Sequence, residues 1–303
     1  MMKVIYGIHK IRKLKRPVVA LGVFDGVHSA HIRILKAAVQ KARRLKGTAV
    51  LVTFWPHPQN QPSIYSLEHR LRLVSELGID VSIVVHFNKA FSRISAEGFV
   101  KKILLKKIRA EYILVGKNFR FGHKAKGDYN LLGKLTKQYN FKLKVFPVIK
   151  INSRPVSSTY IRRLIIRGDL AAARKILGRP VSVLGTVTRG DSLGRRLGFP
   201  TANIDPHHEV LPPSGVYAVR VMLDRRSLKG VCYIGSKPTF KNESEEMIEV
   251  YIFNFKKNIY TKYLEINFLK KIRKEKKLKS SSALIEQIKR DILKAQVYFS
   301  LHK

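Results

Sequence analysis

Two histidines three residues apart stand in the segment GVFDGVHSAH, residues 22–31. An apolar run precedes this segment and a helical pattern follows it, so we expect a turn that ends a strand and starts a helix. The N-terminus of a helix presents free N–H groups and the positive end of the helix dipole, which suits an anion. Side chains three apart share one helix face, so His28 and His31 would face one phosphate. Two imidazoles there suit the charge that develops on a transferring nucleotidyl group.

Hydroxyl side chains and arginines form a second candidate phosphate site in the segment VSSTYIRR, residues 156–163. Serine and threonine at the start of a helix are typical N-caps, so a purely structural cap is one interpretation of residues 157–159. A capped helix start that also carries Arg162 and Arg163 suits the triphosphate tail of a nucleotide. The residues alone leave both interpretations open.

The C-terminal half contains a different set of residues, suited to phosphoryl transfer. Thr201 and Asn203 lie on the same side of an extended stretch and offer the hard oxygen ligands that Mg²⁺ prefers. The loop of residues 190–198 carries Arg195 and suits phosphates facing its backbone N–H groups. Glu249 alternates with apolar neighbours, which predicts that it points away from the core. A surface glutamate is the simpler interpretation, but phosphoryl transfer to an alcohol needs such a carboxylate.

The composition limits the class of protein that positions these residues. A length of 303 residues corresponds to about two domains, and 45% apolar residues exclude wholesale disorder. Lys and Arg number 60 against 20 Asp and Glu, a net charge of +40, which favours acidic partners such as nucleotides, nucleic acid or anionic membrane. The single cysteine, Cys232, favours a reducing, cytoplasmic location. No apolar run reaches the roughly 18 residues of a membrane helix.

Short apolar strands alternate with helical patterns over the first half of the chain. This alternation predicts a parallel sheet with helices on both faces and ligands beyond the carboxyl ends of its strands. Neither a P-loop nor a G-x-G-x-x-G motif occurs in the chain. The predicted strands are residues 18–24, 48–55, 81–87, 112–115 and 143–148. Four helices are predicted: two include residues 32–42 and 71–77, and two span residues 97–105 and 130–138.

The pattern changes near residue 180, beyond which strands follow one another without helices between them. Residues 181–187, 215–223, 230–234, 248–253 and 263–269 form these strands and predict an antiparallel barrel or sandwich. Residues 280–301 form a closing amphipathic helix. We therefore predict two domains, residues 1–179 and 180–303.

The first segment resembles the H-x-G-H signature of the nucleotidylyltransferase superfamily, as used by the bacterial bifunctional riboflavin kinase/FMN adenylyltransferases (FAD synthetases). Other segments resemble motifs of that family in its order: TFWPHP at 53–58, VGKNFRFG at 115–122, VSSTYIR at 156–162, LGFPTAN at 197–203, IGSKPTF at 234–240 and EVY at 249–251. The likeness runs from about Pro17 to Leu293. It implies an α/β, Rossmann-like nucleotidylyltransferase domain, followed by an antiparallel, six-stranded flavokinase-like β-barrel with a C-terminal helix.

The resemblance also implies an activity and its site residues. Riboflavin would be phosphorylated by ATP with Mg²⁺ to FMN, and FMN would be adenylylated by a second ATP to FAD. Glu249 would be the base of the kinase, and His28, His31 and Arg162 would serve adenylyl transfer. The other implied residues are Gly22, Phe24, Asp25, Gly26, Ser158, Thr159, Arg163, Gly185, Gly190, Arg195, Gly198 and Pro200 for ATP and its phosphates; His57, Asn118, Phe119 and Arg120 for the flavin; and Thr201 and Asn203 for the metal.

Three positions depart from the family's motifs. Ala30 replaces the glycine of H-x-G-H, Tyr160 replaces the first arginine of S-S-T-R-I-R, and Tyr251 stands where a histidine is frequent. One alternative is therefore a riboflavin kinase with a degenerate adenylyltransferase half. A more distant one is a basic nucleic-acid-binding protein on an enzyme scaffold, although compositional drift toward lysine gives the same charge. We expect small-molecule partners, without membrane or nucleic acid; the sequence leaves the oligomeric state open.

Overall fold

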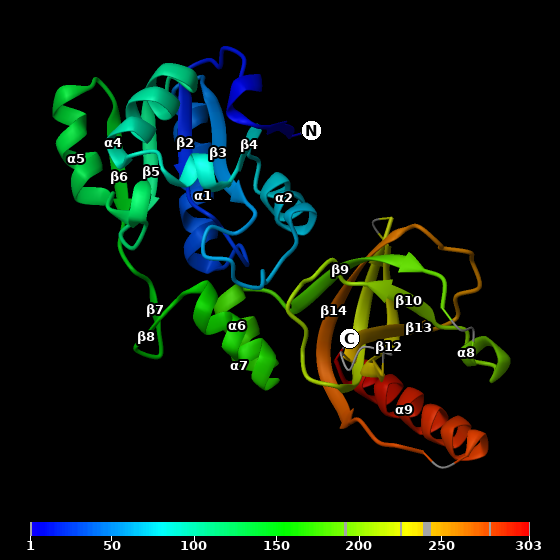
Figure 1. The fold of residues 1–303 in the computed structure, drawn as a ribbon. Helices are drawn as coiled ribbons and strands as arrows, with labels where there is room; N and C mark the ends of the chain where they lie inside the picture. Colours follow the sequence, from blue (N-terminus) through cyan, green and yellow to red (C-terminus); the bar gives the residue numbers. More distant parts are fainter. Residues whose placement is uncertain (1, 191–192, 225, 239–243, 279, 303) are drawn as a thin grey trace. The chain divides into compact units, whose positions relative to one another are not determined.

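The computed structural model describes residues 2–190, 193–224, 226–238, 244–278 and 280–302. Contacts divide the chain into two compact units, residues 1–158 and 159–303. Figure 1 shows a helix-covered sheet in the first unit and a strand-rich barrel with a long closing helix in the second.

The first unit is built on one parallel sheet, as predicted. Its strand order is β1-β4-β3-β2-β5-β6, and all neighbouring strands are parallel. The central strands are apolar and buried almost throughout, because helices cover both faces. The strands are β1 (Lys3–Tyr6), β2 (Pro17–Leu21), β3 (Thr48–Trp55), β4 (Val81–His86), β5 (Tyr112–Gly116) and β6 (Lys142–Phe146), and a hairpin of β7 (Lys150–Ile151) and β8 (Arg154–Pro155) follows.

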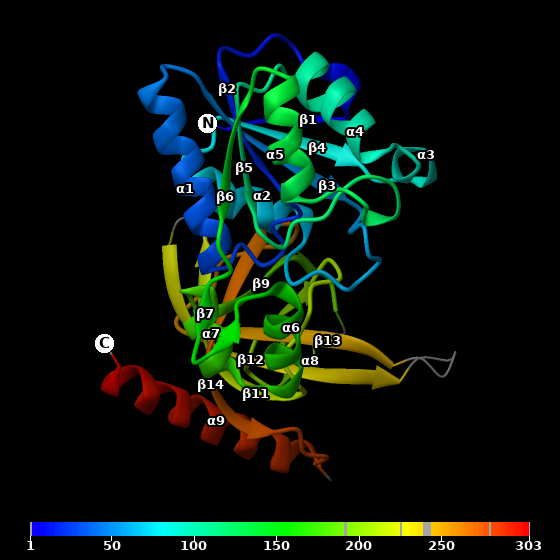
Figure 2. The same ribbon diagram turned by 90° about the vertical axis from the view of Figure 1, so that its left-hand side faces the viewer.

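Helices pack on the two faces of this sheet (Figure 2). On one face Leu35 and Val74, from α1 and α2, share a hydrophobic cluster with Leu51 of β3. On the other face Phe99 and Leu135, from η2 and α5, share a cluster with residues of the same strand. The helical elements are η1 (Ile8–Lys10), α1 (Ser29–Arg44), α2 (Leu67–Glu76), α3 (Lys89–Ser92), α4 (Ala96–Gly98), η2 (Phe99–Lys107), η3 (His123–Ala125) and α5 (Tyr129–Gln138).

Several details differ from the expectations. The strand predicted at 143–148 is β6, which ends at Phe146. The strand predicted at 18–24 ends at Leu21, because the chain turns at Phe24, whose φ is +55°. Residues 97–105 are mostly a π-helix: the N–H of Ile108 donates to the carbonyl of Ile103 at 2.9 Å, five residues back. The edge strand β1 was not predicted, since its four residues are too few for a periodic pattern.

The second unit contains α6, apart from its first residue, and α7. It continues as a closed antiparallel barrel of six strands, which confirms the predicted architecture. The strand order around the barrel is β10-β13-β12-β11-β14-β9. The five longer strands correspond to the predicted ones, although β13 ends at Ile252, one residue before the predicted end. The sixth strand is β10. The elements are α6 (Ser158–Arg167), α7 (Leu170–Leu177), β9 (Val181–Thr188), α8 (Leu193–Arg196), β10 (Ala202–Asp205), β11 (Gly215–Leu223), β12 (Arg226–Pro238), β13 (Ser244–Ile252), β14 (Tyr263–Lys274) and α9 (Ser281–Leu301).

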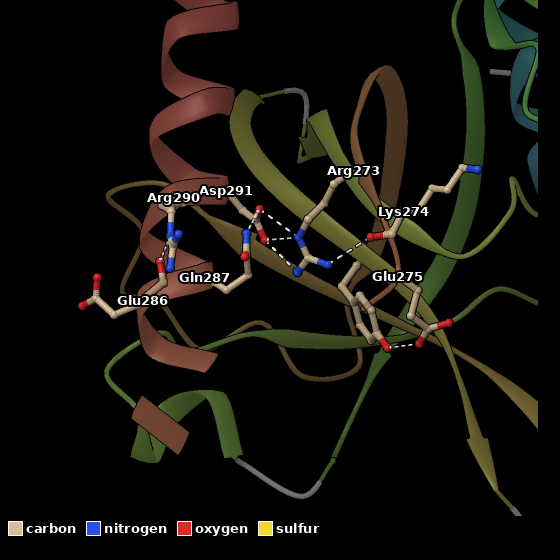
Figure 3. A network of polar contacts seen from close by, with 8 residues as sticks. Arg273, Lys274, Glu275, Glu286, Gln287, Arg290 and Asp291 are labelled. Atoms are coloured by element: carbon tan, nitrogen blue, oxygen red, sulfur yellow. Dashed lines mark hydrogen bonds and ion pairs between the residues drawn. The ribbon is translucent and has the colours of Figure 1, made fainter. Parts of the chain in front are cut away.

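The closing helix α9 packs on the outside of the barrel. Ala295 and Phe299 of α9 form one cluster with Val216 and Val231 of β11 and β12. Figure 3 shows the polar part of this contact, where the Nε of Arg273 donates to both carboxylate oxygens of Asp291, at 3.0 and 2.9 Å. Gln287 donates to the same carboxylate at 2.9 Å. An ion pair with several hydrogen bonds, between a buried Asp291 and a half-buried Arg273, therefore fixes α9 to β14.

The helices α6 and α7 lie with the barrel unit. Asp169 caps the N-terminus of α7, and Gly178, with a φ of +77°, ends it in the left-handed conformation that glycine favours. The compact units thus divide the chain at Ser158, whereas the sequence places the domain boundary after residue 179. That boundary, as the limit of a separately folding domain, stays a prediction.

Candidate active sites

Three of the sequence motifs follow three neighbouring strands of the first unit. The turn at 22–28 follows β2, the loop at 56–58 follows β3, and the turn at 117–120 follows β5. These strands are adjacent in the order β3-β2-β5. Because they are parallel, the three motifs lie at one edge of the sheet, where ligands bind in such folds.

The turn after β2 has an unusual backbone. Phe24, Gly26 and Val27 have φ values of +55°, +77° and +38°, in the left-handed region that branched residues avoid. Glycine adopts a positive φ without strain, which favours it at position 26. The carboxylate of Asp25 is buried and accepts the backbone N–H of Ile64 at 2.9 Å. Asp25 thus fastens the turn to the segment before α2.

The two histidines lie together at the N-terminus of α1. His28 is the N-cap, and its Nδ1 accepts the backbone N–H of His31 at 3.4 Å. The two imidazole rings are stacked, with centroids 3.5 Å apart, and Phe24 meets His31 edge-on at 5.0 Å. His28 is buried and His31 is half-buried. The two histidines therefore lie together at a helix N-terminus, as predicted. The turn before them contains Gly22, Phe24, Asp25 and Gly26.

The second phosphate motif meets this turn at Ser158. Ser158 is the last residue of the first unit, and its hydroxyl donates to the carbonyl of Asp25 at 2.8 Å within that unit. Along α6, Thr159 is exposed, Arg162 is buried and Arg163 is exposed.

The predicted flavin residues occupy the other two loops of the same edge. His57 follows the Pro56 of a cis peptide, and its Nδ1 accepts the N–H of Gln59 at 3.2 Å. Asn118 and Arg120 are exposed, and Arg120 pairs with Asp128 at 2.9 Å. The ring of Phe119 stacks on that of Phe121 at 5.6 Å and packs against the core cluster, which fits the core role that aromatic residues usually have.

Sequence reasoning missed one residue near this edge, Arg70. It is fully buried on α2, and its Nη1 donates to the carbonyl of Val23 at 2.7 Å and to Thr53 Oγ1 at 3.2 Å. A signal existed, because Arg70 lies on the same helix face as Leu67 and Val74. A charge at the centre of an apolar helix face indicates a buried cation.

In the second unit, β10 and β13 bring the predicted kinase residues together. Asn203 and Glu249 are direct partners in the register of these strands, so their side chains lie on the same face. The hydroxyl of Thr201 donates to Glu249 Oε2 at 3.2 Å. Ile248 and Val250 are buried, with 1% exposed each, and Glu249 is half-buried on the opposite face, as its alternation predicted.

Glycines bring the loop before β10 close to these side chains. A Cβ on Gly190 would lie 2.3 Å from the amide nitrogen of Asn203, and a Cβ on Gly194 would lie 2.9 Å from Thr201 Oγ1. Gly198 turns the chain with a φ of +87°, and Gly185 lets β9 approach the backbone of β10. Arg195 and Pro200 are exposed. Part of the predicted phosphate loop, Asp191 and Ser192, lies outside the described residues.

A tyrosine on the next strand, β12, lies beside Glu249 on the same face of the barrel. Tyr233 of β12 is the register partner of Glu249, and its hydroxyl donates to Glu275. Burial raises the pKa of Tyr233, and the hydrogen bond to Glu275 and the charges of Glu275 and Glu249 add to that shift. The phenol is therefore a hydrogen-bond donor at neutral pH.

Comparisons with known proteins match both units. The family model for FAD synthetase matches residues 10–160, and the model for riboflavin kinase matches residues 177–299. The chain is similar to the bifunctional riboflavin kinase/FMN adenylyltransferases of Buchnera aphidicola subsp. Schizaphis graminum (36% identical, over 99% of this chain and 100% of the relative), Escherichia coli K12 (34%, over 100% and 99%) and Bacillus subtilis 168 (34%, over 99% of each).

A solved structure agrees over nearly the full length. The crystal structure of a Streptococcus pneumoniae protein named as a macrolide-efflux protein covers 97% of this chain and 99% of its own, with a TM-score of 0.84 and 28% identity. In the part of this chain that the structure describes, no helix is both long enough and apolar enough to cross a membrane. Two adjacent family models and full-length relatives above 30% identity lead to one conclusion: the chain belongs to the bifunctional riboflavin kinase/FMN adenylyltransferase family.

Proposed function

We propose that the barrel unit transfers the γ-phosphate of ATP to riboflavin, with Glu249 as the base. The observation that supports this most directly is the group of Thr201, Asn203 and Glu249, formed by the pairing of β10 with β13. In this group, the carboxylate of Glu249 would orient the ribityl hydroxyl and accept its proton. The loop of residues 190–198 would cover the phosphates.

The donor atoms of this group fit a magnesium ion. A hydroxyl, an amide oxygen and a carboxylate are hard ligands, and Mg²⁺ typically takes few protein ligands together with substrate phosphates and water. Thr201 and Asn203 would hold the ion, which would neutralise phosphate charge during transfer. Gly190 and Gly194 leave room for the loop beside these two residues.

The first unit would adenylylate FMN with a second ATP. The attacking group is already a phosphate, so the reaction needs positioning and charge stabilisation and no strong base. His28 and His31 at the start of α1 would supply part of this. The resemblance to the family also assigns Arg162 and Arg163 to the phosphates of ATP. His57, Asn118, Phe119 and Arg120 would line the flavin side of the same edge. In this proposal Ala30 reduces the activity without abolishing it.

The remaining assignments follow from these reactions. The substrates are small anions and a flavin, so the surplus of basic residues needs no nucleic-acid partner, although a basic surface also attracts nucleic acid. The cytoplasm is the compartment that fits a single buried cysteine, Cys232.

One incubation tests this assignment. The protein is mixed with riboflavin and MgATP, and the flavins are separated over time. We expect FMN to appear first and FAD later. A folded protein that forms no FMN would refute the whole proposal, and FMN without FAD would leave a kinase with a degenerate first unit. Tight RNA or duplex binding at physiological salt, in competition with ATP, would favour the nucleic-acid alternative.

A further inference from the structure

The function proposed above assigns no role to the buried cation Arg70. It is the largest fully buried side chain of the described residues, with an exposed fraction of 0%. It stands on α2 among Leu67, Leu71 and Val74, which form the apolar face of that helix. An apolar residue would be the ordinary occupant of such a position.

The guanidinium of Arg70 lies at the carboxyl ends of β2 and β3. Its Nη1 donates to the Val23 carbonyl at 2.7 Å and to Thr53 Oγ1 at 3.2 Å. The Thr53 hydroxyl donates to the same carbonyl at 2.8 Å. The indole of Trp55 lies 5.5 Å from the guanidinium carbon, a cation–π contact. All four residues belong to the first unit, so the arrangement is internal to it.

This burial opposes folding. Within the described residues, Nε and Nη2 of Arg70 have no hydrogen-bond partner. Burial lowers the pKa of the guanidinium, and the negative charges of Asp25 and Glu68 oppose that shift. An incompletely bonded buried charge is unfavourable, and an apolar replacement of buried charges is often neutral or stabilising. The Val23 carbonyl would keep its bond from Thr53. Stability alone therefore does not explain Arg70.

The carbonyl that Arg70 holds begins the strained turn before the histidines. Phe24 and Val27 are non-glycine residues at positive φ, and such conformations persist only where surrounding contacts enforce them. The turn ends at His28, which caps α1 and stacks on His31. We propose that Arg70 is a positioning residue for adenylyl transfer, which holds the Val23 carbonyl and so fixes the turn that places the two histidines. The inference rests on the role proposed for the histidines.

The test separates stability from activity. In Arg70→Met we expect the kcat of FAD formation from FMN and ATP to fall about 10²-fold, as misplaced catalytic groups do. The KM for FMN should change little, and the thermal midpoint of the first unit should stay or rise. Arg70→Lys keeps one donor and should recover part of kcat. Arg72→Met is the matched control, because Arg72 lies on the same helix with 40% of its side chain exposed; it should leave both readouts unchanged. Riboflavin phosphorylation reports that the other unit is intact.

A chemical rescue adds a readout that a structural role would not give. In Arg70→Ala, millimolar guanidinium ion should restore FAD formation, whereas equal urea should not. Three outcomes would each overturn the inference. Arg70→Met could keep the parental kcat, its kcat could fall only in step with the thermal midpoint, or guanidinium could fail to restore Arg70→Ala. His31→Asn distinguishes the two levels: if it keeps the parental rate, the histidine role fails; if it loses activity while Arg70→Met does not, only the role of Arg70 fails.

Discussion

The two candidate sites of this chain are assembled in different ways. In the barrel unit, the register of two strands sets Asn203 opposite Glu249 on one face. In the first unit, a turn with three residues at positive φ, a buried cation and a helix cap together place His28 and His31. A site set by strand register depends on ordinary backbone, whereas a site set by a strained turn depends on the contacts that enforce the strain.

This difference has a consequence for mutation. Substitutions of the reacting groups should act locally in both units. Substitutions of supporting residues should reduce activity more in the first unit than in the barrel unit. The position of the histidines depends on several supporting contacts, whereas that of Asn203 and Glu249 depends on strand register. The substitutions below are arranged from the largest expected effect to the smallest.

The largest effect should come from Glu249→Gln. Loss of a positioned base typically costs about 10²–10⁴-fold, so riboflavin phosphorylation should fall by that factor. FAD formation from FMN and ATP should stay at the parental rate, since Glu249 belongs to the other site. The two rates are measured separately by flavin chromatography. Glu246→Gln, an exposed glutamate of the same strand, is the control; parental phosphorylation in Glu249→Gln would refute its role.

Asp291→Ala should destabilise the barrel unit. Arg273 and Asp291 have side chains 20% and 4% exposed, and removal of one partner of a buried pair costs about 3–5 kcal/mol; partial exposure of Arg273 favours the lower end. The transition of the second unit in a thermal scan should move down while that of the first stays. Glu286→Ala, which breaks an exposed pair with Lys289 on the same helix, should change stability by less than about 1 kcal/mol. Equal shifts in the two variants would contradict the buried-pair argument.

Gly190→Ala should weaken the kinase site through its supporting loop. The added Cβ would lie 2.3 Å from the Asn203 amide nitrogen, so the loop or Asn203 must move. Overpacking costs about 1–3 kcal/mol, which corresponds to roughly a 5- to 150-fold rise in the KM for MgATP. Gly133→Ala, at a position with nothing within 4 Å of the new Cβ, is the control. An unchanged KM for MgATP in Gly190→Ala would show that the loop does not cover the phosphates.

Ala30→Gly should produce the smallest and opposite effect. Ala30 stands in the first turn of α1, where the family has glycine, and its methyl group would crowd the nucleotide. We expect faster FAD formation at low ATP, by about 5-fold, the lower end of that overpacking range, with the kinase step unchanged. Thermal stability should drop slightly, because glycine is the poorer helix former by about 1 kcal/mol. A rate no better than that of the parent would mean that the pocket already accommodates the methyl group.

Local pattern alone was enough to predict much of this molecule. The apolar runs at 48–55 and 215–223 are strands β3 and β11 with those bounds, and the alternation around Glu249 indicated its face correctly. These are properties of neighbouring residues, because strand period and turn residues act over a few positions. The order of the motifs was likewise readable without a structure.

Tertiary structure decided what depends on residues far apart in the chain. Position 70 is separated from Val23 by 47 residues. The apolar helix face around Arg70 indicates its burial, but no local pattern says that its guanidinium binds the turn after β2. The partnership of Asn203 with Glu249 needed the order of strands around the barrel. The π-helix of residues 99–107 has a sequence that reads as an ordinary α-helix. Burial of charge, strand partnership and helix type are decided by packing across the fold, and therefore only the folded chain specifies them.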